Sequence, residues 1–413
     1  IINELSKFSP SEVLLNDNIL QYKGIIDFIK NKLNCVCEIY GKDEVDENAC
    51  LTTVLNHFKG KTIEQLNLTD KNLAVTALGS LISYINKTQK NGAMRIVNVN
   101  FYKDDEYMCV DITAKRNLEI IKTMRSGEKR GTLLWVLDKT KTSMGKRYIK
   151  KALEQPLINL TQITKRQCAI KELIATPQKL DEIISLFNNI YDIERLMTRV
   201  VYGTVNPREI RSLGCTISNL PNLKKITETF SSSYLMAIND NIDTLEEISS
   251  LIDNAISDEP PIAMKDGGVI KQGFNEELDN YRDLCFNAKE YIAKIEQREK
   301  EKTGISKLKI GYNRIFGYYI EVTNSFLSQV PETYIRKQTL SNCERYITQE
   351  LKDLEAKVLS ANDKILALEL EIFDEVRKFV AQKIDIIQST ATAISKLDFI
   401  CSLSIVALEN NYV

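Results

Sequence analysis

The chain has 413 residues, of which 43% are hydrophobic and 27% are charged. A chain of this length exceeds what one hydrophobic core supports, so we expect two to four domains, and its apolar content excludes an intrinsically disordered protein. The 55 Lys and Arg residues against 56 Asp and Glu residues give a formal net charge of -1. This balance excludes a uniformly basic nucleic-acid wrapper but leaves room for a local basic patch.

The nine cysteines and the single histidine argue against disulfide, metal and histidine chemistry. Cys35 and Cys37 are separated by one residue, no Cys-x-x-Cys pair occurs, and this pattern is typical of reduced thiols in the cytosol. His57 has no cluster of ligands at suitable spacing, so we expect neither a metal site nor a catalytic histidine. We find no apolar run that approaches the roughly 20 residues of a membrane span. The first residues resemble neither a signal peptide nor a translation start, so we expect the chain to begin within a longer protein.

The first 114 residues mix strand and helix patterns. Alternating apolar residues predict strands at 36–40, 96–101 and 107–112. Helical spacing predicts a helix at 72–86, and together these elements indicate a small α/β domain. Asp104, Asp105 and Asp111 border the last predicted strand and would suit a nuclease carboxylate cluster. We disfavour that catalytic interpretation because acidic residues at strand ends are usually only solvated.

From residue 115 the strand pattern gives way to helical spacing for roughly 150 residues. Apolar residues recur at helical intervals over 116–175, with breaks at Gly127, Gly131 and Pro156. We therefore expect a helical bundle in this part of the chain.

Two long helices with coiled-coil seams are predicted next. Apolar residues over 274–295 alternate in spacings of four and three, and this helix ends in a charged run before Gly304. Ser341 and Glu344 have the spacing of a capping box and predict the start of the second helix, whose seam continues to Ile372.

A strand-rich insert separates the two predicted helices. Alternation predicts strands at 308–312, 315–323 and 334–340. In the second of these, the pattern places Tyr318, Ile320 and Val322 on one face together with Phe316. Residues 304–345 carry six basic and three acidic residues, a net charge of +3 in a slightly acidic chain.

This net positive insert is a candidate site for binding a polyanion. Arg and Lys neutralise phosphates and release counterions, and amide or hydroxyl side chains donate to phosphate oxygens without reading bases. The amides at the start of the helix predicted at Ser341 would add partial positive charge. We expect sequence-independent binding of the nucleic-acid backbone, with an ordinary solvated surface as the alternative. The candidate residues are Lys307, Lys309, Arg314, Arg336, Lys337, Gln338, Thr339, Asn342 and Arg345.

Motifs in order along residues 115–413 resemble the MutS family of DNA mismatch-repair proteins. They lie at 131–147, 155–157, 191–195, 206–209, 311–313, 317–322 and 334–346. The sequence departs from the family pattern at Lys337, where arginine is common, and at Cys343, where alanine is common. Lys337 keeps the positive charge but loses the bidentate fork of a guanidinium.

The resemblance implies a multidomain, mainly α-helical protein. It implies a ribonuclease-H-like α/β connector domain without nuclease chemistry at 1–114, a helical core and lever at 115–267, a β-rich clamp at 268–350, and the second part of the lever and core at 351–413. It also implies double-stranded DNA as the ligand, mismatched in the intact protein, a homodimer enclosing the duplex, and a MutL-type partner on the connector. A cytoplasmic location, in the bacterial cytosol or nucleoid, fits these implications.

Two functions of the family have no matching motif in this sequence. In the family, an N-terminal domain senses the mismatch with a wedge whose motif is Phe-x-Glu. Phe274 begins a literal match to this motif, but its side chain fits the helical seam, and we interpret the match as coincidence. A phosphate-binding loop needs G-x-x-x-x-G-K-[ST]. Leu55 occupies the first glycine position before Gly60-Lys61-Thr62, and Gly145-Lys146 also fails because Thr140 stands at that position. We expect this chain to lack ATPase activity and to hold no cofactor or metal. The intact protein should be a DNA-dependent ATPase that uses ATP and Mg, coupled to the clamp through the helices past Leu354.

Two alternatives stay open on the sequence alone. The long seams would also suit a coiled-coil scaffold that binds proteins through its arms, and such a scaffold predicts no salt-dependent affinity for DNA. A MutS paralogue that acts on recombination junctions would keep the fold and change the DNA substrate.

Overall fold

The computed structural model describes residues 1–8, 10–33, 35–40, 46–89, 96–99, 107–313 and 317–412. The fold is mainly helical with small sheets, as predicted. The chain divides into two compact units. The first comprises residues 1–205, 212–250 and 377–413, and the second comprises residues 206–211 and 251–376.

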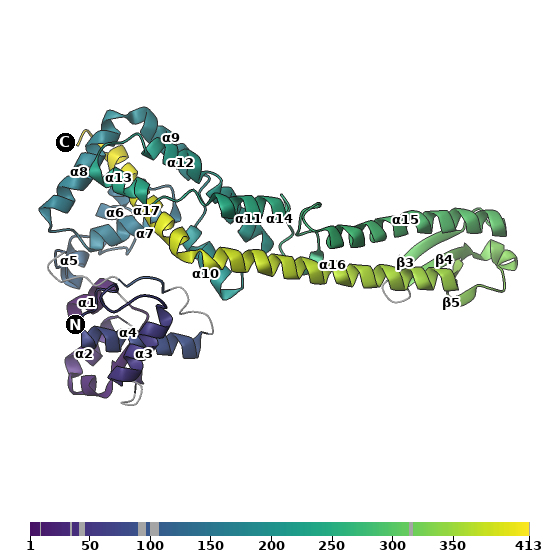
Figure 1. Ribbon diagram of the computed structural model, residues 1–413, viewed down its shortest axis with the longest axis horizontal. Helices are drawn as coiled ribbons and strands as arrows, with labels where there is room; N and C mark the ends of the chain where they lie inside the picture. The colour runs from purple at the N-terminus through teal and green to yellow at the C-terminus, as the bar shows by residue number, and fades with distance from the viewer. Residues whose placement is uncertain are drawn as a thin grey trace. The chain divides into compact units, whose positions relative to one another are not determined.

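The N-terminal part of the first unit contains a parallel strand pair and several helices (Figure 1). These elements are α1 (Ile2–Phe8), β1 (Glu12–Asn16), α2 (Lys23–Asp27), β2 (Val36–Tyr40), α3 (Glu47–His57) and α4 (Asn72–Thr88). The strand predicted at 36–40 and the helix predicted at 72–86 are confirmed, whereas β1 was not predicted. Helices α3 and α4 pack through Val54, Phe58, Val75 and Ile82, which are buried.

The strand predicted at 107–112 is wrong. Tyr107 forms only an isolated bridge to Leu157, and helix α5 (Ile112–Asn117) begins where the strand was expected to end. The carboxylate of Asp111 accepts a hydrogen bond from the Ala114 amide at 2.6 Å, so this residue caps the helix. Residues 96–99 are described and form no strand. Residues 100–106, including Asp104 and Asp105, lie outside the described residues.

The helices predicted from residue 115 onward are present (Figure 1). They are α6 (Leu133–Leu137), α7 (Ser143–Glu154), α8 (Leu160–Ala175), α9 (Pro177–Phe187), α10 (Ile193–Tyr202), α11 (Pro207–Ile217), α12 (Leu220–Thr227), α13 (Ser233–Asp240) and α14 (Glu246–Ala255). Several begin at a residue whose side chain accepts from the amide three positions on, namely Thr132, Thr142, Asn159 and Asp192. Each such cap satisfies an amide that the helix itself leaves unbonded.

Arg147 joins two of the sequence motifs. Its Nη1 and Nη2 atoms donate to Asp192 at 2.8 and 2.7 Å, and its Nε donates to Glu194 at 3.0 Å. Burial opposes ionisation of the Asp192 carboxyl, but the hydrogen bonds from Arg147 and from the Arg195 amide lower its pKa below the usual value. The motifs at 131–147 and 191–195 are therefore two halves of one ion-pair cluster.

Helix α17 (Ile384–Asn410) is the apolar core helix of the first unit. By length and composition it could cross a membrane, contrary to our expectation that no apolar run approached that length, but 67% of its most apolar stretch is buried in the unit. Asp398 is a buried acid on this helix. It accepts from the amide and the hydroxyl of Thr142, each at 2.7 Å, and burial raises the pKa of its carboxyl.

The second unit contains two long helices and a small sheet. Helix α15 (Glu276–Thr303) lies alongside α16 (Gln349–Gln382), and the sheet lies at one end of the pair (Figure 1). Arg282 bonds to Glu369 near the start of α15, and Tyr291 bonds to Glu350 further along, so the two helices run antiparallel. The predicted helical seams are confirmed in part, because Leu278, Ile295, Leu351, Ala361 and Ile372 are buried.

The predicted start of the second helix at Ser341 is wrong. Residues Cys343–Ile347 form strand β6, and α16 begins at Gln349. The Leu351 amide bonds to the Thr348 hydroxyl at 3.4 Å at the true helix start. Glu344 is not a capping residue, and its carboxylate instead accepts from Arg336 and Tyr346 within the sheet.

Candidate nucleic-acid interface

The net positive insert folds as an antiparallel sheet of four strands within the described residues, in the order β3-β4-β6-β5. The strands are β3 (Lys309–Asn313), β4 (Gly317–Thr323), β5 (Ile335–Thr339) and β6 (Cys343–Ile347). Three of them match predicted strands, and β6 occupies the segment for which a helix start was predicted. Strands β3 and β5 are the two edges, roughly 15 Å apart at about 4.8 Å per strand spacing.

One face of the sheet packs against the long helices. Ile320 and Val322 are fully buried, as their predicted face requires, together with Leu308 of the preceding turn. The Tyr334 hydroxyl donates to the buried carboxylate of Glu299 on α15 at 2.7 Å. The Glu296 carboxylate accepts from the Ile310 amide at 2.9 Å, so polar bonds as well as apolar packing fix the sheet on α15.

Two motif glycines are needed where the backbone is crowded. An added Cβ at Gly311 would lie 2.8 Å from the ring of Tyr319 on the paired strand. Gly317 begins β4 with a φ of +74°, a conformation that favours glycine, and a Cβ there would clash with the carboxylate of Glu355 on α16. The motifs at 311–313 and 317–322 therefore encode close packing of the sheet.

The other face of the sheet carries a row of charged and polar side chains. The register pairs Lys309 with Glu321, Glu321 with Arg345, and Arg345 with Gln338, so these four residues cross the sheet from edge to edge. Arg345 donates to Glu321 and to Gln338, each at 3.1 Å, and its guanidinium lies 4.2 Å from the centroid of the Tyr319 ring. Its side chain is 19% exposed. Arg345 is therefore held and partly neutralised inside the sheet.

Arg336 is paired but more accessible. Its Nη1 atom donates to Glu344 at 3.2 Å, and its side chain is 63% exposed. The Tyr346 hydroxyl donates to the other oxygen of Glu344 at 2.5 Å. This bond and the charge of Arg336 lower the pKa of the Glu344 carboxyl, so the ion pair persists at neutral pH.

The remaining predicted residues are distributed over the edges and turns. Lys337 and Thr339 are exposed on edge strand β5, and Asn342 is exposed in the turn before β6. Lys307 and Lys309 are exposed at the opposite edge. Neither Lys307 nor Lys337 forms a salt bridge within the described part of the chain. Arg314 lies outside the described residues.

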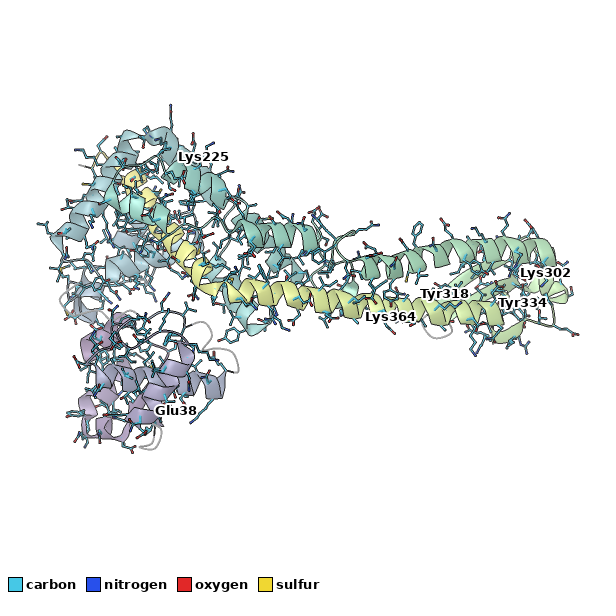
Figure 2. The ribbon with its side chains drawn as sticks, in the orientation of Figure 1. Glu38, Lys225, Lys302, Tyr318, Tyr334 and Lys364 are labelled. Atoms are coloured by element: carbon cyan, nitrogen blue, oxygen red, sulfur yellow. The ribbon has the colours of Figure 1, made fainter. Side chains whose placement is uncertain are left out.

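Sequence reasoning missed the cations at the end of α15. Figure 2 shows Lys302 and Tyr334 at the end of the helix pair where the sheet lies. Lys302 is exposed, whereas Arg298 is paired with Glu350, and Lys300 is paired with Glu296 at 2.5 Å. The basic residues of the charged run before Gly304 were the available signal, since cations are favoured in the last turn of a helix.

The far end of the α15–α16 pair is fixed by a buried carboxylate. Glu369 is fully buried and accepts from the amides of Gly268 and Val269 at 3.1 and 3.3 Å. The Arg282 guanidinium donates to Glu369 at 2.6 Å and to the Ile270 carbonyl at 2.7 Å. This network joins both helices to the loop that precedes α15.

The arrangement offers groups that can bind phosphate. Within the described ranges, no three His, Cys, Asp or Glu side chains gather closely enough to hold a metal ion. The exposed cations described above give this end of the unit positive charge that attracts phosphates.

Comparison with known proteins gives the family. The model of MutS domain III matches residues 113–404, and the model of MutS domain II matches residues 1–99. Over the whole chain the sequence is 41% identical to the DNA mismatch repair protein MutS of Lachnoclostridium phytofermentans, 43% identical to that of Alkaliphilus oremlandii and 42% identical to that of Acetivibrio thermocellus. The chain spans 44% of the first of these relatives and 47% of the other two. The chain therefore belongs to the MutS family of DNA mismatch-repair proteins and carries the family's domains II and III.

Proposed function

We propose that the sheet and the end of α15 bind the sugar-phosphate backbone of duplex DNA without reading its sequence. The observation that carries the proposal is the set of exposed cations around the sheet, Lys302, Lys307 and Lys337, which form no salt bridge within the described part of the chain. Unpaired lysines are point charges that can follow any phosphate, so they supply affinity without base recognition.

The predicted DNA-binding residues differ in how readily they can reach a phosphate. Lys337 has no salt bridge with a described residue to give up on binding. Arg336 must exchange Glu344 for a phosphate, and Arg345 must leave both Glu321 and the Tyr319 ring. We therefore assign direct phosphate binding first to Lys337, and a mainly structural role to Arg345.

Fluorescence anisotropy with a labelled duplex at several salt concentrations tests this proposal. We expect weak binding whose log affinity falls linearly with log salt, with the slope decreasing by roughly 0.9 for each phosphate that a variant no longer neutralises. The variant Lys337→Glu and the double variant Arg336→Glu plus Lys337→Glu should weaken binding and flatten the slope. The double variant Lys224→Glu plus Lys225→Glu on α12 is the matched control, since it reverses two adjacent charges in the other unit (Figure 2 labels Lys225). Equal affinity in the sheet variants and the control would overturn the assignment.

For the intact protein we propose the assembly that the family resemblance implies. Its ligand would be mismatched double-stranded DNA enclosed by a homodimer, with a MutL-type partner on the connector at residues 1–114. An ATPase domain using ATP and Mg would be coupled to the clamp through α16 beyond Leu354. The relatives named DNA mismatch repair protein MutS support this proposal. A cross-link between α15 and α16 in the intact protein should uncouple ATP from DNA release, and unchanged release kinetics would count against the coupling.

A scaffold function is a second candidate. A groove of about 650 Å³ lies between α15 and α16 and is lined largely by apolar side chains, including Tyr281, Leu284 and Val358. Such a surface would suit a protein partner. Salt-independent or absent DNA binding favours the scaffold, and higher affinity for a four-way junction than for a duplex favours the junction paralogue.

A further inference from the structure

A basic pocket lies within the first unit, among helices α7, α8, α13 and α17. Its volume is about 510 Å³, which is in the range of small-molecule sites. Figure 1 shows these helices gathered in one part of the unit. The cations that line the pocket are Lys151 on α7, Arg166 on α8 and Lys396 on α17, and no described residue that lines it is acidic.

None of the three cations has a carboxylate partner among the described residues. Lys151 and Lys396 form no salt bridge with any described residue, and Lys396 is only partly exposed. The Arg166 guanidinium lies 5.3 Å from the centroid of the Phe399 ring, and its Nη2 atom donates to the Tyr148 hydroxyl at 3.3 Å. Three positive charges in a concave site, without a compensating acid, strongly favour an anion there.

Tyr234 places a buried hydroxyl at the wall of the same pocket. Its hydroxyl oxygen lies close to Tyr148 and Arg166, but it forms no hydrogen bond of normal geometry with either or with any other described residue. Burial raises the pKa of Tyr234, so the phenol keeps its proton at neutral pH and can donate. A buried polar group without a partner is costly and is commonly satisfied by a ligand or an ordered water.

A second cleft of about 440 Å³ adjoins the basic pocket. The two share Tyr234, Thr392 and Lys396. Apart from these shared residues, the cleft is lined by uncharged side chains, including Asn241 and Ala393. A basic pocket next to a cleft whose one cation is the shared Lys396 fits a ligand with an anionic end and an uncharged end.

We propose that this pocket binds a phosphorylated small molecule of nucleotide size. Its phosphate chain contacts Lys151, Arg166, Lys396 and the Tyr234 hydroxyl, and its uncharged part occupies the adjoining cleft. This site is separate from the sheet proposed to bind DNA, and its three cations and Tyr234 lie within the residues that the model of domain III matches.

Isothermal titration calorimetry of the full chain with sodium tripolyphosphate and with ATP in the absence of magnesium tests the proposal. We expect both probes to bind, and ATP to bind more tightly if its nucleoside occupies the cleft. Lys396→Gln and Arg166→Gln should each weaken tripolyphosphate binding about tenfold, because each removes a charge-assisted hydrogen bond. Tyr234→Phe should weaken it about fivefold and leave the shape of the pocket almost unchanged.

Two control variants locate the binding. Lys150→Gln alters the exposed neighbour of Lys151 on α7 and should leave the affinity unchanged. Lys225→Gln alters an exposed lysine on α12, outside both proposed sites, and should also leave tripolyphosphate binding unchanged. Absence of binding by both probes overturns the proposal. So does binding that is abolished in Lys337→Glu but kept in Lys396→Gln and Tyr234→Phe.

A chemical-protection experiment on the unaltered chain gives a readout that does not depend on folded variants. Lysine acetylation mapped by mass spectrometry should show tripolyphosphate protecting Lys151 and Lys396 but not Lys150. Equal acetylation of all three lysines with and without tripolyphosphate would contradict the proposed site.

Discussion

The buried network around Glu369 allows a quantitative prediction. The change is Arg282→Met, which keeps much of the side-chain volume and removes the cation that faces a fully buried carboxylate. The Arg282 side chain is 24% exposed, and Glu369 is 0% exposed. The Gly268 and Val269 amides would then be the remaining donors to Glu369 among those described above.

Breaking a buried ion pair by removing one partner costs about 3–5 kcal/mol. Because a quarter of the Arg282 side chain is exposed, water can partly replace the guanidinium, and we expect a loss near the lower figure, about 3 kcal/mol. The double variant Arg282→Met plus Glu369→Leu should recover part of this loss, since it removes the uncompensated charge. Recovery should be incomplete, because two amides would lose their acceptor.

Amide hydrogen exchange at Gly268 and Val269 measures this loss locally, without assuming two-state unfolding of a chain with two units. A loss of about 3 kcal/mol corresponds to roughly 150-fold faster exchange. Arg298→Met is the matched control on the same helix. The Arg298 side chain is 52% exposed and that of its partner Glu350 is 37% exposed. A salt bridge this exposed should contribute at most about 1 kcal/mol. Unchanged protection of both amides in Arg282→Met would refute the role assigned to the network.

Three further predictions concern stability. Asp192→Asn should cost about 1–2 kcal/mol at pH 7, because Asp192 caps α10 and accepts from Arg147. Folding lowers the pKa of the Asp192 carboxyl. Its contribution to stability is therefore fully present at pH values above the unfolded-state pKa of about 3.9, and it is lost as the pH falls through the lower folded-state pKa. In urea unfolding, the difference in unfolding free energy between the unaltered chain and Asp192→Asn should therefore become smaller below about pH 4. A difference that stays constant with pH would contradict this prediction. Gly317→Ala should lower the melting temperature because its φ of +74° strains any residue with a Cβ, whereas Gly24→Ala, where a Cβ meets open space, is the control. Tyr334→Phe should cost about 1–3 kcal/mol in thermal unfolding, because Glu299 keeps its burial and loses a donor; no loss would show that water replaces the hydroxyl.

Local patterns succeeded where one periodicity controlled a long segment. The seam over 274–295 predicted α15, and the alternation over 315–323 predicted which residues of β4 face the core. The structure also showed contacts made by the family motifs that could not be read from the sequence. Arg147 and Asp192 are 45 residues apart and form one ion pair, and Gly311 is small because the Tyr319 ring lies against it.

Prediction failed where a short signal had two meanings. Ser341 and Glu344 have capping-box spacing, but their segment bonds to β4 and β5 on both sides and forms a strand. The alternation at 107–112 predicted a strand, but Asp111 caps a helix instead. In the first place pairing with two other strands outweighed the local preference, and in the second a helix cap did. Such preferences are weak over five or six residues.

The sequence by itself determined the mainly helical class, the long seams, the net positive insert and the resemblance to the MutS family. Only the tertiary structure decided which cations are available to a ligand. Arg345 and Lys337 are similar charges eight residues apart, yet strand register places Arg345 between Glu321 and Gln338 and leaves Lys337 exposed at an edge. Availability depends on partners that are far away in the chain, and a charge count along the sequence contains no information about them.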